Sequence, residues 1–228
     1  MDNYRGQNVF ISPTAVVEPN CHIGNNVTIY DNVVIKSGTY IWDNVVIGKR
    51  PMGVSSNYRK LEEMVQSTII GEKCVISCGA VIYAGSIIGN ECLISEHAII
   101  REKTFLEGEN IIGGCTLVQY SCKIGKRTRI LNGSIISSHS VIGTDNFISW
   151  GFMSVSDKAF GDNGYSENLV KGPVIGNNNN IGPNVTILDN LSIGDCNIIG
   201  AKALITKNIG SMGVYMGMPA KYIKERKL

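Results

Sequence analysis

The stretch IGEKCVISCGAVIYAGSIIGNECLISEHAII, residues 70–100, has an isoleucine at every sixth position, from Ile70 to Ile100. An α-helix has 3.6 residues per turn, so it cannot keep a six-residue spacing on one face. Short strands joined by tight turns can keep that spacing, with each isoleucine pointing inward. The stretch therefore predicts a repeated β structure.

The same spacing of Ile, Val or Leu extends over most of the chain. It runs in three registers, residues 11–47, 70–148 and 175–205, and gives 27 hexads. Glycine often follows the aliphatic residue, as in Gly71 and Gly89, where we expect it to accept both the backbone angles and the crowding of each corner. The fifth position is usually small, and Cys74 and Cys92 fall there as compact apolar fillers.

This pattern resembles the hexapeptide-repeat family, whose members form a left-handed parallel β-helix with three hexads per coil. The resemblance covers residues 9–222 and implies an all-β fold of about nine coils, stacked roughly 4.8 Å apart. We expect residues 1–210 to form the β-helix and residues 211–228 a cap and tail, with PAKYIKERK as a short C-terminal helix.

Two insertions interrupt the repeat, at residues 49–67 and 156–173. A stack of repeats extrudes its insertions onto one surface, which is often the functional one. The first insertion is charged and carries Arg50 and Arg59, and the second is rich in Gly, Asp and Asn. We interpret both as functional loops, with Arg50, Arg59 and Asn132 as candidate substrate-binding residues.

The chain ends on a motif found in acyltransferases of this family. Residues 217–221, GMPAK, resemble the family's Gly-x-Pro-Ala-Lys/Arg ending, and residues 200–207, GAKALITK, are similar to its GAGAVVTKD coil. The resemblance implies a cleft for acetyl-CoA at the last coils. The donor-binding residues that it implies are Gly182, Gly200, Ala201, Lys202, Lys207, Pro219 and Lys221. The alternative is an ending that only caps the solenoid against edge pairing.

A further resemblance concerns the acceptor. Residues 181–194, IGPNVTILDNLSIG, look like the penultimate coils of sugar N-acyltransferases, which are homotrimers that bind nucleotide-linked amino sugars between subunits. It implies an N-acetyltransferase of a nucleotide-linked amino sugar in surface-polysaccharide or glycan biosynthesis. Sugar O-acetylation and a non-catalytic binding or assembly protein remain as alternatives.

Acyl transfer to an amine or hydroxyl benefits from a base, and histidine is the usual choice. Residues 18 apart stack on one corner of adjacent coils, so Asp157 is predicted above His139 as its orienting carboxylate. His97 is the second candidate base, and His22 is predicted to be a surface residue. A catalysis that needs no histidine stays open, because the family's Asn-His pair is Asn132-Gly133 here.

Other functions are disfavoured by composition. The net charge of +2 and pI near 8.1 give no basic excess for nucleic acid. The three histidines are widely separated in sequence, unlike the zinc ligands of the γ-class carbonic anhydrases, so no metal is expected. No secretion signal or membrane span is evident, and seven cysteines without a CxxC pair indicate a cytoplasmic protein.

Overall fold

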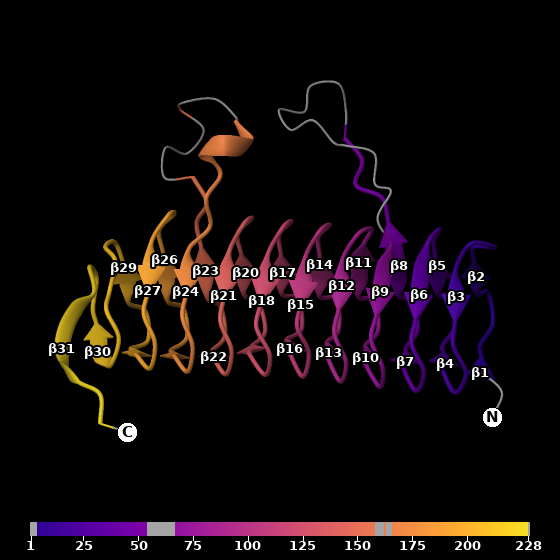
Figure 1. Cartoon of the computed structure of the whole chain (residues 1–228), viewed down its shortest axis with the longest axis horizontal. Helices are drawn as coiled ribbons and strands as arrows, with labels where there is room; N and C mark the ends of the chain where they lie inside the picture. Colours follow the sequence, from indigo (N-terminus) through magenta and orange to yellow (C-terminus); the bar gives the residue numbers. More distant parts are fainter. Residues whose placement is uncertain (1–3, 54–66, 158–161, 163–165, 228) are drawn as a thin grey trace.

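The computed structural model describes residues 4–53, 67–157, 162 and 166–227, which wind through three long β-sheets (Figure 1). From β1 to β29, successive strands enter sheets A, B and C in turn, so a strand pairs in parallel with the strand three further along. Val75 lies beside Leu93 and Ile76 beside Ile94, so each residue pairs with its counterpart in the next coil. The predicted all-β fold, a left-handed parallel β-helix, is confirmed.

The strands are mostly two residues long. The 12 strands of sheet A are β1 (Tyr4–Arg5), β4 (His22–Ile23), β7 (Tyr40–Ile41), β10 (Val75–Ile76), β13 (Leu93–Ile94), β16 (Ile111–Ile112), β19 (Arg129–Ile130), β22 (Phe147–Ile148), β25 (Asn180–Ile181), β28 (Ile198–Ile199), β30 (Gly213–Met216) and β31 (Lys221–Glu225). The 10 strands of sheet B are β2 (Phe10–Ile11), β5 (Thr28–Ile29), β8 (Val46–Lys49), β11 (Val81–Tyr83), β14 (Ile99–Ile100), β17 (Leu117–Val118), β20 (Ile135–Ile136), β23 (Met153–Ser154), β26 (Thr186–Ile187) and β29 (Leu204–Ile205). The 9 strands of sheet C are β3 (Val16–Val17), β6 (Val33–Ile35), β9 (Thr68–Ile70), β12 (Ile87–Ile88), β15 (Phe105–Leu106), β18 (Lys123–Ile124), β21 (Val141–Ile142), β24 (Val174–Ile175) and β27 (Ser192–Ile193).

The stack has about eleven turns, so the predicted nine is too few. The strands that the hexad count missed have no Ile, Val or Leu at the inward position by which hexads were counted. Arg5 lies beside Ile23, Ser154 beside Ile187 and Tyr215 beside Ile199. Backbone pairing with a regular neighbour therefore carries the coil through positions where the side-chain pattern fails.

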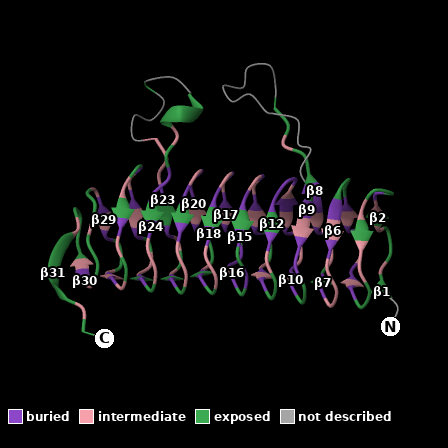
Figure 2. Ribbon diagram, in the orientation of Figure 1, coloured by how far each residue is buried: buried purple, intermediate pink, exposed green. Residues whose placement is uncertain are grey.

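The core is a column of inward side chains under each sheet (Figure 2). Successive residues of a strand face opposite sides, so Ile76 and Ile94 are fully buried while Val75 and Leu93 face outward and are only half-buried. Burial of one such isoleucine side chain contributes about 1.5–3 kcal/mol. Cys74 and Cys92 are also buried, as predicted for compact fillers, and Cys21 and Cys122, which occupy the same hexad position, are buried too.

The glycine prediction was half wrong. Positive φ angles fall mainly on the fourth residue of the hexad, for example 57° at His97 and 61° at His139. Among the described glycines that follow the aliphatic residue, only Gly48 has a positive φ. Crowding explains the others, since a Cβ at Gly89 would lie 2.2 Å from the carbonyl oxygen of Glu107 in the next coil.

The predicted C-terminal helix is wrong. β31 is a strand that pairs antiparallel with β30 at the end of sheet A, where Val214 lies beside Lys224. The rings of Tyr215 and Tyr222 meet edge to face, with centroids 5.6 Å apart. The free edge of β30 offers backbone donors and acceptors, which outweigh the weak helical preference of a short segment.

Both insertions leave from the turns that join sheet B to sheet C, which we call the B–C edge (Figure 1). The first insertion lies between β8 and β9 and the second between β23 and β24, where it contains the 3-10 helix η1 (Glu167–Leu169). Residues 54–66, with Arg59, are outside the described residues. Within the described part of the chain, no helix has the length and apolar character needed to cross a membrane.

The two faces of one strand give a matched stability test. Ile112 is fully buried and its neighbour Ile111, on the outer face of β16, is half-buried. We expect Ile112→Ala to lower the free energy of unfolding by about 2–5 kcal/mol, because it leaves a cavity in the column. Ile111→Ala should cost less than half as much in the same denaturant titration, and equal losses would contradict the assigned strand faces.

Candidate functional site at the B–C edge

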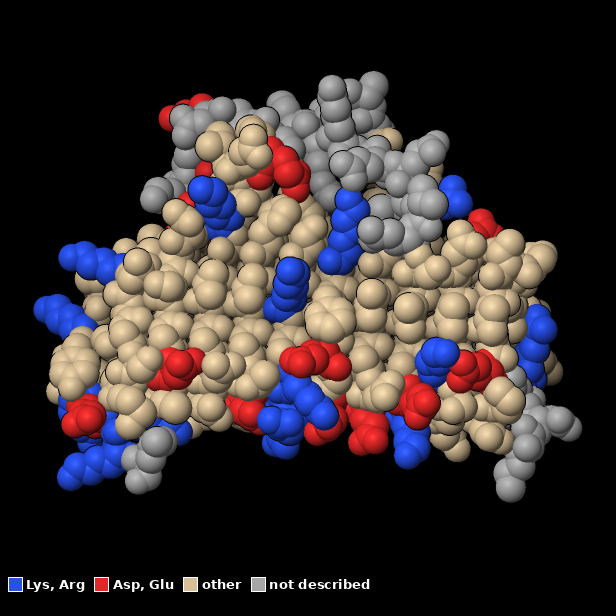
Figure 3. Space-filling model, viewed as in Figure 1, with Lys and Arg blue, Asp and Glu red and all other residues tan. Residues whose placement is uncertain are grey.

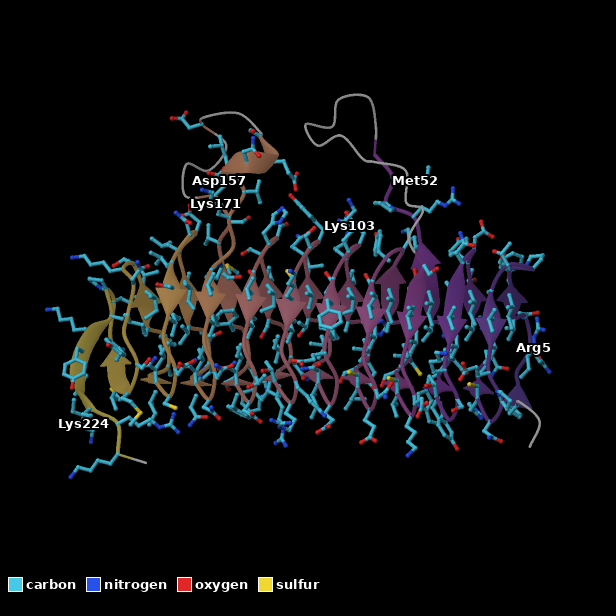
Figure 4. The ribbon with its side chains drawn as sticks, in the orientation of Figure 1. Arg5, Met52, Lys103, Asp157, Lys171 and Lys224 are labelled. Atoms are coloured by element: carbon cyan, nitrogen blue, oxygen red, sulfur yellow. The ribbon has the colours of Figure 1, made fainter. Side chains whose placement is uncertain are left out.

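Four turns of the B–C edge lie between the two insertions. Sheet B runs β8, β11, β14, β17, β20, β23, so the turns after β11, β14, β17 and β20 separate the insertions. We call residues 83–86, 101–104, 119–122 and 137–140 the inter-loop edge. Lys103 lies on it, between the two protruding segments (Figure 4). An insertion stands at each end of this edge.

His139 occupies the last turn of the inter-loop edge and contacts the second insertion. Its Nε2 lies 2.8 Å from Oε1 of Glu167 in η1. The two side chains are 34% and 48% exposed, so both remain accessible. A carboxylate accepts hydrogen bonds, so Nε2 carries the proton and the lone pair of the neutral ring is on Nδ1. The pair therefore presents an oriented imidazole that can take up a proton.

Tyr120, one coil before His139, supports this pair. Its ring meets the imidazole edge to face, with centroids 5.2 Å apart and an interplanar angle of 85°. Its hydroxyl lies 3.5 Å from the other carboxylate oxygen, Oε2 of Glu167. Tyr120 is itself buried, so it limits how far the imidazole and the carboxylate can turn.

A group of serines holds the turn beneath His139. The backbone N–H of Ser137 donates to Oγ of Ser154 at 2.8 Å, and the two hydroxyls lie 2.9 Å apart. Ser140 donates through Oγ to the carbonyl oxygen of Ser137 at 2.6 Å. Ser154 stands where regular coils have an aliphatic side chain, and its hydroxyl ties the His139 turn to the coil that opens into the second insertion.

The coil register near His139 differs from the predicted one. Met153 still pairs with Ile135, its counterpart in the preceding coil, but Val141 pairs with Val174, which follows the second insertion. Gly172 packs against this turn, since a Cβ there would lie 2.5 Å from Ser138 O and from Ser140 N. Gly172 thus takes the stacked place expected for Asp157.

Asp157 itself lies where the second insertion begins. It is half-buried, and the preceding residue, Ser156, accepts the backbone N–H of Lys171 at 3.0 Å (both Asp157 and Lys171 are labelled in Figure 4). The predicted position above His139 is therefore wrong, because the insertion intervenes before the next coil closes. A catalytic role for Asp157 stays a prediction.

The opposite end of the inter-loop edge carries a cationic and aromatic cluster. Arg101 donates from Nε and Nη2 to the two carboxylate oxygens of Glu102, at 2.8 and 3.2 Å. The guanidinium also lies over the ring of Tyr83, with Cζ 4.7 Å from its centroid, and Nζ of Lys49 is 5.5 Å from the same centroid. The side chain of Glu102 is only 1% exposed, an unusual burial for a carboxylate.

The remaining histidines are elsewhere. The ring of His22 stacks between Tyr4 and Tyr40 on sheet A, with centroids 4.4 and 5.3 Å away. His97 lies on the turns that join sheet A to sheet B, the A–B edge, over Gly79, whose Cβ would be 2.5 Å from its Nδ1. Among the described residues, no three His, Cys, Asp or Glu side chains gather as a metal-binding group.

The predicted substrate-binding residues are spread over the molecule. Arg50 is at the base of the first insertion, with Nη2 3.7 Å from Oδ2 of Asp31. Asn132 is on the A–B edge, where its side-chain oxygen accepts the N–H of Gly114 at 3.2 Å. Arg59 lies outside the described residues. Of the two that the structure describes, Arg50 adjoins the inter-loop edge and Asn132 does not.

Four of the predicted donor-binding residues meet at the A–B edge of the last coils: Gly182, Gly200, Ala201 and Lys202. Pro219 passes nearby, because the N–H of the following Ala220 donates to Leu204 O at 2.8 Å. The glycines face their own chain: a Cβ at Gly200 would lie 2.7 Å from Cγ of Met216. Ala201 and Lys202 are exposed, while Lys207 follows β29 on the B–C edge and Lys221 is in β31.

Sequence reasoning missed Glu167, Tyr120, Lys49 and the Arg101–Glu102 pair. Glu167 lies in a segment without a period, so no column count could place it. Glu102 and Tyr120 could have been noticed in the sequence. They occupy equivalent positions in the turns of adjacent coils, and one is charged and the other bulky.

Comparison with known proteins agrees with the fold. Residues 172–207 match the profile of the bacterial transferase hexapeptide (six repeats), and residues 5–111 match that of the GMPPB C-terminal domain. The chain therefore carries the hexapeptide repeat of that transferase model in residues 172–207. The resemblance on which the fold prediction was based is therefore confirmed.

Solved structures share the fold of this hexapeptide-repeat protein. LpxA from Acinetobacter baumannii is 21% identical with a TM-score of 0.50, covering 96% of this chain and 72% of LpxA. A UDP-N-acetylglucosamine acyltransferase is 16% identical with a TM-score of 0.58, covering 93% of this chain and 70% of its own. A probable macrolide acetyltransferase from Lysinibacillus sphaericus is 47% identical over 53 residues, which span 23% of this chain and 29% of that relative.

The cysteines give a test of the site's surroundings. Burial raises the pKa of the Cys122 thiol, which lies under the His139 turn, to about 12. Cys115, at the A–B edge, is exposed. We expect iodoacetamide at pH 8 to alkylate Cys115 in the folded protein and to leave Cys122 unmodified, as measured by peptide mass spectrometry.

Unfolding in guanidinium chloride should make Cys122 react as fast as Cys115. Rapid alkylation of Cys122 in the folded protein would mean that the His139 turn opens readily.

Proposed function

We propose that this hexapeptide-repeat protein is an acyl-CoA-dependent acyltransferase that uses acetyl-CoA to acetylate the amino group of a nucleotide-linked amino sugar. The observation that carries the proposal is the His139–Glu167 pair, an accessible imidazole oriented by a carboxylate between two insertions. The names of two relatives, an acetyltransferase and a UDP-N-acetylglucosamine acyltransferase, support the reaction class. A role in surface-polysaccharide or glycan biosynthesis follows from such an acceptor.

His139 is proposed as the general base. Nδ1 takes a proton from the acceptor amine as its nitrogen forms the new bond to the thioester carbonyl carbon. The C–S bond breaks, and the sulfur leaves as the free thiol after receiving a proton. Glu167 holds the Nε2 proton and stabilises the positive ring that exists between these proton transfers.

Acetyl-CoA is proposed to bind along the last coils, with its thioester end directed toward the inter-loop edge, where His139 lies. The exposed Ala201 and Lys202 fit this role, since an open backbone offers amide partners and the ammonium is a point charge for phosphate. Gly182 and Gly200 contribute through close packing of the coils and not through an open groove, because their own chain fills the space beside them.

We propose a homotrimer, supported by the outward row of sheet C. Its members are half-buried or exposed, and Lys123 is the one charged residue among Val16, Val34, Ile69, Ile87, Phe105, Lys123, Val141, Val174 and Ser192. Figure 3 shows few charged side chains across this face. An apolar strip of this length favours burial against another subunit.

All seven cysteines are free thiols, which supports a cytoplasmic location.

Substitution of the base tests the mechanism. His139→Asn should lower kcat at saturating substrates by about 10²–10⁴-fold, because the amine loses its proton acceptor. The measurement is release of CoA thiol with a panel of nucleotide-linked amino sugars. His97→Asn is the matched control and should retain turnover; unchanged turnover of His139→Asn would remove it as the base.

Two further variants separate the alternative carboxylates. Glu167→Gln should lower kcat with little change in KM, because the imidazole loses its counter-charge while substrate contacts remain. Asp157→Asn should leave kcat close to that of the unmodified protein. A loss of kcat in Asp157→Asn with an unchanged kcat in Glu167→Gln would restore Asp157 as the partner of His139. Release of CoA thiol only with sugar acceptors that lack the amine and offer a hydroxyl would establish O-acylation instead.

A further inference from the structure

The cluster of Lys49, Tyr83 and Arg101 has no part in the proposed proton transfer. It lies on the same edge as His139, at the end next to the first insertion. In the B–C turns, Arg101 and Ser137 occupy equivalent positions two coils apart, and Tyr83 is one coil before Arg101. At about 4.8 Å per coil, Arg101 lies about 10 Å along the stack from the His139 turn.

Arg101 is held in one orientation. Glu102 accepts hydrogen bonds from its Nε and Nη2, and the flat guanidinium rests on the ring of Tyr83. A guanidinium has five N–H donors, so three remain, and no acceptor for them is found among the described residues. A fixed fork with unused donors matches the oxygens of a phosphate.

Lys49 supplies the net positive charge of the cluster. Glu102 neutralises Arg101, whereas within the described chain no carboxylate lies within ion-pairing distance of the exposed Lys49 ammonium. Tyr83 lies between Lys49 and Arg101 in the stack, so its ring contacts one cationic group from each neighbouring coil. The neighbouring outward residues of sheet B, Val81 and Ile99, are apolar, so these two positions add no charge.

We propose that Lys49, Tyr83 and Arg101 form the binding site for the diphosphate of a nucleoside diphosphate, the carrier part of the acceptor. This rests on the proposed function, in which the sugar amine reaches His139. A pyranose ring bridges the two groups: its amine lies at His139 and its phosphate ester at Arg101. Lys49 and Arg101 bind the phosphate oxygens, Tyr83 keeps both cations in place, and the nucleoside extends toward the first insertion.

Coenzyme A also contains a nucleoside diphosphate, so the same chemistry has two sources. The structure favours the acceptor, because the residues proposed for the donor lie on the last coils, whereas this cluster is near the first insertion. Binding of each source to the same variants distinguishes them.

The test is isothermal titration of the full chain with UDP, dTDP and GDP, followed by the tightest of the three on variants. Lys49→Met and Arg101→Lys should each raise its Kd about tenfold or more, since each removes a charge or the fork. The matched control is Lys73→Met, an exposed lysine on the turns that join sheet C to sheet A, which should bind as before. Inorganic pyrophosphate should compete with the nucleotide.

Three results would overturn the site. They are no binding of any nucleotide at millimolar concentration, equal affinity in all variants, and weakened binding of coenzyme A with unchanged binding of the nucleoside diphosphate. Melting temperatures show whether Arg101→Lys remains folded, and Lys49→Met, an exposed change, tests the site independently. Binding needs no acyl transfer, so loss of this site and failure of His139 as base are separate outcomes.

Discussion

Parallel backbone pairing between residues one coil apart is the constraint on which the structure depends. The N–H of Gly89 donates to Leu106 O at 2.8 Å, and equivalent bonds recur through all three sheets. A buried amide without a partner is costly, so a strand tolerates little more than the single added residue of β8, where Gly48 bulges between Ile47 and Lys49 opposite β11. Long insertions are therefore confined to the turns. Both insertions of this chain emerge from the turns of one edge.

The same constraint arranges the chemistry of that edge. Each turn of the inter-loop edge presents its fourth hexad residue with a positive φ, which is the position of both Lys103 and His139. Side chains at equivalent positions of successive coils are thereby aligned in a row. Two of these rows place the Arg101–Glu102 pair and the Tyr120–His139 pair at either end of one surface.

The periodic part of the molecule could be predicted from sequence. Inward columns, buried cysteines and the corner position of His139 follow from counting sixes, because each coil repeats the environment of the last. The partner of His139 could not be predicted in this way. Glu167 reaches it from an insertion that interrupts the register, so the column count pointed to Asp157 where Gly172 lies.

The C-terminal segment shows another limit. Lys221–Glu225 has no strong pattern of its own, and its strand conformation comes from the exposed edge of β30. The glycines differ again: their positions were predictable, but the reason for most of them is the close approach of the next coil, as at Gly89. Local sequence preference decides little where a neighbouring backbone supplies the partner.

The spacing of the two insertions along one edge has an evolutionary consequence. Loss or duplication of one whole coil of sequence between them would preserve every inward column and every backbone partner. It would bring the insertions closer or move them apart by one strand spacing, about 4.8 Å. The distance between the two insertions can thus change in steps of one coil, by genetic deletion or duplication, without a new side-chain arrangement.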